Sequence, residues 1–363
     1  MAKTSATHVL TGSERSAAAQ SRISTLGSFA VAAFCLFLGF HGSDLAQAPA
    51  GAARSPESSG QGTEAPAQEG VPPGFRIGVE VNEVYLSVSA RSLETSGFVR
   101  GLTKEDFRVL EDGIPQEITN FNSESVPAHV VILLDISGSV QGELPEFRRA
   151  IVNFAGALTK EDKIAIITFS DKSKLILDWT SDAKKVEFAA NSVYSKGTTV
   201  YYDALYVTFA DLLKNISGRK AVIVLTDGID TASSTNFQQI ERLALRSEAM
   251  VYFVSKLDEY AAMAAGARWA YPLEPSLKDA FIQRVRSEMN TLATETGGAV
   301  LNYVAMSLND IYQRVAEELR NQYYIGYLPT NRAKDGAWRK IEIQIRKPGV
   351  QATTRAGYYA AKK

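Results

Sequence analysis

Cysteine is almost absent from this chain of 363 residues, and histidine is scarce. Cys35 is the single cysteine and lies in an apolar run near the N-terminus. If that run is removed during export, no thiol remains, which excludes disulfides, thiol catalysis and thiolate metal sites. Beyond the N-terminal region only His129 could serve as a histidine base. It starts a predicted strand whose far end leads to Ser137, so a Ser-His triad is not expected.

Strong charge of one sign and nucleotide-binding motifs are also missing. The formal net charge is −1, and no basic stripe with interleaved aromatic residues occurs. Nucleic acid is therefore not expected as a partner, because its binding depends on clustered cations that neutralise phosphates. Neither a G-x-G-x-x-G loop nor a P-loop lysine motif is present.

The N-terminal residues have the order of an export signal. Lys3, Arg15 and Arg22 precede the apolar run 23–40, and small residues follow it. We predict a signal peptide over residues 1–48, cut after Ala48 or alternatively after Ala50. The run is also nearly long enough to span a bilayer, so an uncleaved anchor is the alternative and would be the chain's only membrane contact. Either way we expect an exported protein, located in the periplasm, in the cell envelope or outside the cell.

Three patterns follow along the rest of the chain. Residues 49–74 are rich in Ala, Pro, Gly, Ser and Glu and predict a disordered linker. Residues 75–126 alternate apolar and polar side chains and contain an Asp-Gly hairpin signal, which predicts β-strands. Residues 127–320 alternate apolar strands with helical segments. This alternation predicts an α/β fold with a doubly wound, mostly parallel sheet.

The last segment, residues 321–363, returns to strand patterns. It holds 9 basic and 2 acidic side chains, whereas residues 76–126 hold 5 basic and 9 acidic ones. Two β-segments of opposite charge on either side of one α/β unit could pair, and we predict that they complete a single β-sandwich into which the α/β domain is inserted. Two separate small modules are the alternative.

Polar side chains follow two of the predicted strands at their carboxyl ends, where open α/β sheets bind ligands. The sequence DISGS places Asp135, Ser137 and Ser139 after one strand, and Asp227 follows another. The loop KGTTVYYDAL adds threonine hydroxyls from a third segment. Oxygen donors without nitrogen or sulfur suit Mg²⁺, Mn²⁺ or Ca²⁺. Because several donors are neutral hydroxyls, the ion would keep positive charge and an open position for an incoming carboxylate.

These three motifs resemble the metal-ion-dependent adhesion site of von Willebrand factor type A (VWA) domains. The family pattern is D-x-S-x-S, then a loop threonine, then an aspartate in T-D-G. Alignment of KGTTVYYDAL with the family's usual G-G-T-x-x-Y-D-A-L selects Thr199 as the ligand and leaves Thr198 in an outer position. The flanking strands resemble the exported VWFA-related proteins first grouped in acidobacteria. The resemblance implies Mg²⁺ or Mn²⁺, with Ca²⁺ less favoured, held by Asp135, Ser137, Ser139, Thr199 and Asp227.

Other polar and aromatic residues have two interpretations each. Asp230 could orient a coordinating water or be a solvated loop residue, and Asp203 is better explained as a first-turn helix residue. Aromatic side chains after the strand MVYFVSK could anchor a partner or pack on the domain's own surface. These are Tyr260, Trp269 and Tyr271.

The sequence as a whole predicts a non-enzymatic binding protein in cell adhesion, which captures an Asp or Glu of a protein partner through its metal ion. One alternative is a scaffold or assembly subunit that uses sheet edges or the aromatic loop. A metal-assisted hydrolase is a further alternative, for which no general base is evident.

Overall fold

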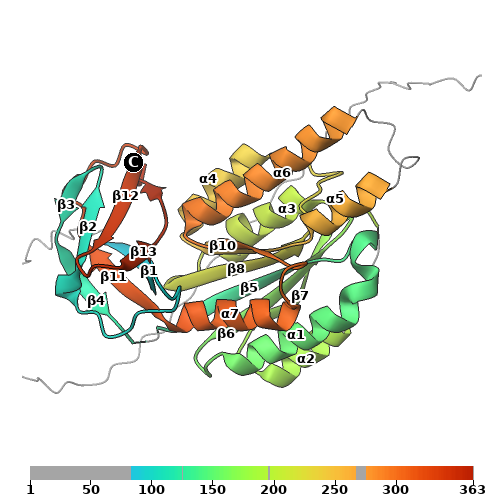
Figure 1. Cartoon of the computed structure of the whole chain (residues 1–363), viewed down its shortest axis with the longest axis horizontal. Coiled ribbons are helices and arrows are strands. Elements are labelled where there is room, and N and C mark those ends of the chain that lie inside the picture. Colours follow the sequence, from blue (N-terminus) through green and yellow to red (C-terminus); the bar gives the residue numbers. More distant parts are fainter. Residues whose placement is uncertain (1–82, 125, 195–196, 267–274, 363) are drawn as a thin grey trace, which may run out of the picture. The chain divides into compact units, whose positions relative to one another are not determined.

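The computed structural model describes residues 83–124, 126–194, 197–266 and 275–362 (Figure 1). The predicted signal peptide over residues 1–48 and the linker over residues 49–74 lie outside the described residues. No helix in the described ranges is both long and apolar enough to cross a membrane.

A six-stranded sheet in the order β10-β9-β8-β5-β6-β7 forms the centre of the α/β part. All neighbouring strands are parallel except β7, which pairs antiparallel with β6. The predicted mostly parallel α/β sheet is therefore confirmed. The strands are β5 (Ala128–Asp135), β6 (Lys163–Phe169), β7 (Ser173–Thr180), β8 (Arg219–Thr226), β9 (Met250–Ser255) and β10 (Ala299–Asn302).

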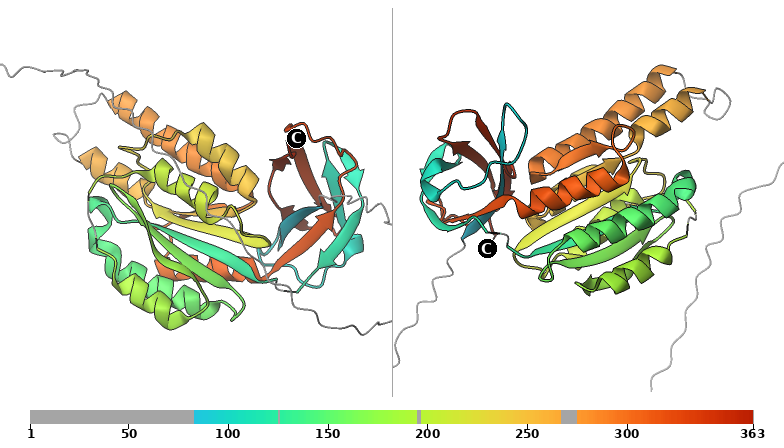
Figure 2. Two further views of the ribbon diagram at one scale, coloured as in Figure 1. Left: turned by 180° about the vertical axis from the view of Figure 1, so that it is seen from behind. Right: turned by 60° about the horizontal axis from the view of Figure 1, so that its bottom comes forward.

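Helices cover both faces of this sheet, as Figure 2 shows. Alternate residues of β5 explain the two layers: Val130 and Ile132 pack in one apolar core with α1, α2 and α7, while Val131 and Leu133 pack in a second core with α3, α4 and α6. A strand buried on both faces must be apolar throughout, which accounts for the run VVILL. The helices are α1 (Leu144–Ala157), α2 (Ala183–Asn191), α3 (Tyr201–Tyr206), α4 (Phe237–Ser247), α5 (Leu257–Gly266), α6 (Pro275–Thr296) and α7 (Leu308–Arg320).

Two further sheets of four strands each, in the orders β13-β1-β11-β4 and β14-β12-β2-β3, are antiparallel. Both sheets combine strands that precede the α/β part with strands that follow it. Asp112 and Gly113 have φ angles of 50° and 80°, as a tight hairpin turn between β2 and β3 requires. The strands are β1 (Val84–Ser92), β2 (Phe107–Glu111), β3 (Ile114–Gln116), β4 (Ile118–Asn122), β11 (Gln322–Tyr327), β12 (Trp338–Ile345), β13 (Val350–Thr353) and β14 (Gly357–Tyr359).

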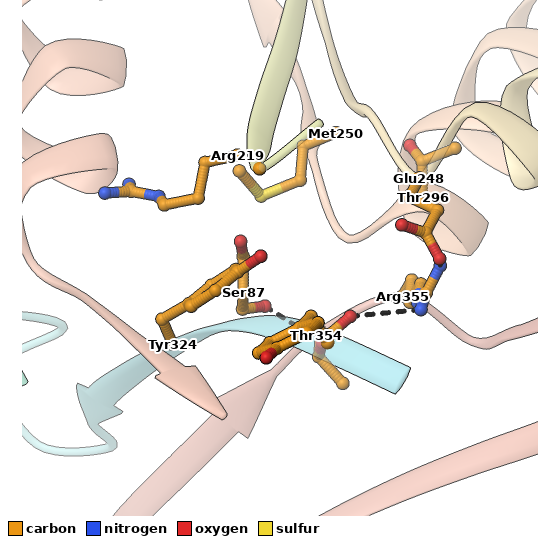
Figure 3. Close-up of a pocket in the computed structure, with 10 residues that line it drawn as sticks. Ser87, Arg219, Glu248, Met250, Thr296, Tyr324, Thr354 and Arg355 are labelled. Atoms are coloured by element: carbon orange, nitrogen blue, oxygen red, sulfur yellow. Dashed lines mark hydrogen bonds and ion pairs between the residues drawn. The ribbon is translucent and has the colours of Figure 1, made fainter. Parts of the chain in front are cut away.

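The described residues lie in one compact unit, and hydrogen bonds join its antiparallel strands to the α/β part. Figure 3 shows a polar cavity of about 20 Å³ between them, large enough for a single water molecule. Beside it the Arg355 guanidinium pairs with Glu248 at 2.9 Å, and the Thr354 hydroxyl donates to the carbonyl of Ser87. The first contact joins the C-terminal segment to the α/β part, and the second joins the two segments predicted to form one sandwich. The exact domain boundaries stay predictions.

Helix α7 leads into β11 after a single residue, and Glu318 fixes this junction. Its carboxylate accepts hydrogen bonds from the Ser89 hydroxyl at 2.9 Å and from the Arg91 guanidinium at 3.1 Å, both on β1. Glu318 is 8% exposed, so little water can replace these bonds. We infer that the side chain aligns the helix with the sheet that continues from it.

Replacing Glu318 by alanine should lower the free energy of unfolding by about 2 kcal/mol, because two hydrogen bonds to a carboxylate are lost and their donors keep only partial access to water. Urea denaturation measures this change. Glu317→Ala is the control, since that neighbour is exposed on the same helix and should change stability by less than about 0.5 kcal/mol. Equal effects of the two variants would contradict this role of Glu318.

Candidate metal centre

Asp135 is the last residue of β5 and is fully buried. One carboxylate oxygen accepts the backbone N–H of Ser137 at 2.9 Å, and the other accepts the Thr226 hydroxyl at 2.9 Å. The first contact is made within the DISGS turn, and the second comes from the end of the neighbouring strand β8. These hydrogen bonds fix the orientation of the carboxylate at the carboxyl edge of the sheet.

Asp227 follows β8 directly and is 6% exposed. Its carboxylate accepts the N–H of Ile229 at 2.9 Å, across a turn in which Gly228 has a φ of 77°. A side chain at Gly228 would come within 2.8 Å of Val285 and Met289, so both the backbone angle and the space favour glycine here. The T-D-G motif thus presents Asp227 on the same edge as Asp135.

The two carboxylates influence each other. Burial raises the pKa of Asp135 to about 6, and the negative charge of Asp227 adds to this increase, while the hydrogen bonds from Ser137 and Thr226 oppose it. A buried carboxylate next to a second one is a chemical environment that favours a bound proton or a bound cation.

The loop before α3 brings in the threonines, which differ in exposure. Thr199 is 8% exposed, whereas Thr198 is exposed. The N–H of Thr199 donates to the Thr231 hydroxyl at 3.0 Å, and the N–H of Thr231 donates to the carbonyl of Thr199 at 3.0 Å. This pair of bonds ties the threonine loop to the loop after β8 that carries Asp227.

Asp230 caps α3 from a different loop, and its expected role in orienting a coordinating water stays a prediction. Its carboxylate accepts the N–H groups of Tyr201 at 2.9 Å and Tyr202 at 3.3 Å, which lie in the first turn of that helix. Asp203 lies in the same turn, as expected, and its carboxylate also accepts hydrogen bonds from Ser234 and Thr235. Both aspartates hold the loop after β8 against α3.

The two serines of DISGS are placed differently. Ser137 is 5% exposed and its side chain hydrogen-bonds to Asp135. Ser139 lies in a short 3₁₀-helix, η2 (Gly138–Glu143), and its side chain is outside the described part of the structure. The described rim therefore brings Asp135, Ser137 and Asp227 together, and backbone hydrogen bonds tie the loop of Thr199 to the loop after β8. The roles of the Thr199 and Ser139 hydroxyls as ligands stay predictions.

Of the expected partner-contact residues only Tyr260 is described; Trp269 and Tyr271 lie outside the described residues. Tyr260 is half-buried and packs against the core formed with α3, α4 and α6. His129 is near the beginning of β5 and its ring packs edge-on against Trp179, at the opposite end of the strand from Ser137. This histidine cannot act as a base at the rim.

The chemistry of the rim fits a hard divalent cation. No group of three or more His, Cys, Asp or Glu side chains that could hold a metal occurs among the described residues. Any ion at this edge would therefore depend on two carboxylates supplemented by hydroxyl oxygens, which is a donor set suited to Mg²⁺ or Mn²⁺. Sequence reasoning missed Thr226 and Thr231, whose hydroxyls orient the donors. Thr226 could have been found from the sequence, because it ends a predicted strand and directly precedes Asp227.

Comparisons with known proteins give a family for the centre of the chain. A family model described as von Willebrand factor type A domain matches residues 130–229. No curated protein matches the chain. Three solved structures illustrate the likeness, and each is 16–19% identical to this chain.

The first is an aerotolerance-related membrane protein from Bacteroides fragilis, with 16% identity, 53% of this chain and 98% of that chain covered, and a TM-score of 0.39. The von Willebrand factor domain of a type V pilus tip protein from Porphyromonas gingivalis has 19% identity, with 30% and 40% covered and a TM-score of 0.28. Proximal thread matrix protein 1 from the mussel byssus, in a form whose adhesion motif is occupied by zinc, has 16% identity, with 56% and 48% covered and a TM-score of 0.41.

The family match starts in β5 and ends just after the T-D-G turn, so it includes both strand ends that carry the aspartates and the threonine loop between them. The helix-covered, mostly parallel sheet has the arrangement expected of that family. Residues 130–229 therefore belong to a von Willebrand factor type A domain.

Proposed function

We propose that the protein is an exported binding protein whose VWA domain holds a divalent cation, Mg²⁺ or Mn²⁺, and captures through it an Asp or Glu side chain of a protein partner. The ligands would be Asp135, Ser137, Ser139, Thr199 and Asp227. The observation that supports this proposal is the pair of buried carboxylates at the ends of neighbouring strands, where the charge of Asp227 acts on Asp135 and the Ser137 side chain bonds to Asp135.

Each residue at the rim has a defined part in this proposal. Asp135 is oriented by Ser137 and Thr226, and Asp227 by the turn at Gly228. A bound ion would supply residual positive charge and an open coordination position for the partner's carboxylate. Because Asp230 and Thr231 connect the loops, a change at one ligand loop would be transmitted to the other.

The proposed partner is a protein rather than a nucleic acid. VWA domains are in general non-enzymatic protein-interaction modules, and the near-neutral net charge offers no polyanion site. The scaffold alternative predicts partner binding that survives chelation, whereas the adhesion proposal predicts that a chelator releases the partner. A pull-down from the native envelope in Mg²⁺, eluted with chelator, distinguishes these two.

Asp135→Ala should abolish binding of Mg²⁺ and Mn²⁺ because it removes the buried carboxylate between the two loops. Titration calorimetry with each ion measures this on the full chain. Asp178→Ala is the matched control, since that exposed aspartate lies on the edge strand β7 and should leave ion binding unchanged. Undiminished heat in Asp135→Ala, with wild-type binding present, would refute the site assignment.

A further inference from the structure

We propose that Lys256 is a positioning residue for the metal site, which holds the segment Gly138–Glu143 in place through an ion pair with Glu143. This inference rests on the proposed function, because it concerns the loop that contains Ser139. No motif in the sequence points to this lysine, and no part of the VWA pattern contains it.

Lys256 directly follows β9, beside the strand that carries Asp227. Its backbone N–H donates to the carbonyl of Thr226 at 3.0 Å, and the Thr226 hydroxyl in turn donates to Asp135 at 2.9 Å. The backbone of Lys256 is therefore one hydrogen bond away from a residue that orients the buried carboxylate. Its position is fixed by the sheet.

The side chain of Lys256 is 5% exposed and reaches across the edge to a second segment. Its ammonium group pairs with the carboxylate of Glu143, and a Glu259 oxygen lies 3.4 Å away. Burial raises the pKa of Glu143, and the contact with Lys256 opposes this rise. A buried ammonium with two carboxylate partners is costly to disturb, because removal of either member leaves an uncompensated charge.

Glu143 is the last residue of η2, the short 3₁₀-helix that starts directly after Ser137 and contains Ser139. Short 3₁₀-helices have poor hydrogen-bond geometry and depend on outside contacts. The segment is anchored on one side by β5 and on the other by Glu143, which also precedes α1. The ion pair therefore defines where the serine-containing turn lies relative to the aspartates.

Positioning and simple electrostatics predict opposite results when the lysine charge is removed. The ammonium group repels a nearby cation, and its removal would leave Glu143 and Glu259 without their counter-charge. If Lys256 acted only through its field, Lys256→Met would therefore strengthen binding of Mg²⁺. If Lys256 holds the turn, the same substitution weakens binding, since contacts outside the ligand set typically change metal affinity by about 10-fold to 100-fold.

The experiment compares Mg²⁺ titration and Mn²⁺ electron paramagnetic resonance on full-chain wild type, Lys256→Met, Lys256→Arg and Lys185→Met. We expect Lys256→Met to bind at least about 10-fold more weakly, Lys256→Arg to recover part of this loss, and the exposed Lys185→Met to match wild type. Equal or tighter binding by Lys256→Met would overturn the proposal. If that variant does not fold, Lys256→Gln replaces it, because the amide can still donate to Glu143 and is also uncharged.

A second measurement separates failure of this inference from failure of the metal site itself. Amide hydrogen exchange of residues 138–143 without any added ion should be at least about fivefold faster in Lys256→Met than in wild type, because opening of the turn is local. Unchanged exchange would overturn the positioning role. Absence of ion binding in the wild type would instead refute the proposed function, and faster exchange would still support the role of Lys256 in holding the turn.

Discussion

Gly298→Ala should lower the free energy of unfolding by at least about 3 kcal/mol, because the added methyl group has no space and the atoms that block it belong to the backbone. A Cβ at this position would lie 2.0 Å from the carbonyl oxygen of Val251 and 2.6 Å from its carbonyl carbon. Val251 is in β9, and Gly298 immediately precedes its parallel neighbour β10. The two strands would have to separate to accept the side chain.

Urea denaturation followed by circular dichroism measures this effect. Gly156→Ala is the control, since Gly156 lies in α1 and a Cβ there meets no atom within 4 Å. Alanine is the better helix former, so this second variant should be stabilised by about 0.5–1 kcal/mol. If the free energy of unfolding of Gly298→Ala is within about 1 kcal/mol of the wild-type value, β9 and β10 can separate at little cost, and the prediction is wrong.

The parts of the fold that the sequence predicts well are those with strong local signals. Continuous apolar runs locate β5, β8 and β9 because both faces of these strands are buried. The sequence predicts helices over residues 237–247 and 308–320, and α4 and α7 have these limits because their starts carry side-chain caps. The side chain of Asn236 accepts the N–H of Gln239, and that of Ser307 accepts the N–H of Asp310.

Weaker signals explain the elements that sequence reasoning missed. Helix α2 buries only Val186, Ala189 and Ala190, and its largest side chain, Phe188, is 80% exposed. Such a segment shows no clear apolar stripe of helical period. The strand and helix alternation does predict a helix near residues 202–214, where α3 and a π-helix over Val207–Leu212 lie. A pattern of 3.6 residues per turn does not anticipate the π-helical part.

At the site, too, local sequence signals predict some features and not others. Asp135 and Asp227 could be placed from sequence because strand ends in a parallel sheet share one edge. The contacts around them could not, because they join segments far apart in the chain. These contacts are Thr226 with Asp135, Asp230 with the start of α3, and Lys256 with Glu143. Residue type and spacing indicate which side chains reach the edge, but the pairing between loops depends on the tertiary fold.

The pH dependence of stability should reveal the buried carboxylate of Asp135. Burial raises its pKa from 3.8 to about 6 in the folded protein, and Asp227 contributes to the rise. Because the folded-state pKa is higher than that of the unfolded chain, the folded protein binds this proton more tightly. Its contribution to stability is fully present below about pH 3.8 and is lost as pH rises through about 6. The loss amounts to about 3 kcal/mol by pH 8.

Other carboxylates also titrate, so the effect is measured as the difference between wild type and Asp135→Asn in the absence of divalent ions. Asparagine keeps an acceptor for the Ser137 N–H and does not ionise. The stability of the variant relative to wild type should therefore increase by about 3 kcal/mol between pH 3 and pH 8. Saturating Mg²⁺ should remove most of this increase, because the ion stabilises the ionised carboxylate of the wild type and competes with its proton. If the free energies of unfolding of the two proteins change in parallel with pH, the pKa of Asp135 is not raised in the folded protein. The electrostatic reason for a cation at this edge would then be lost.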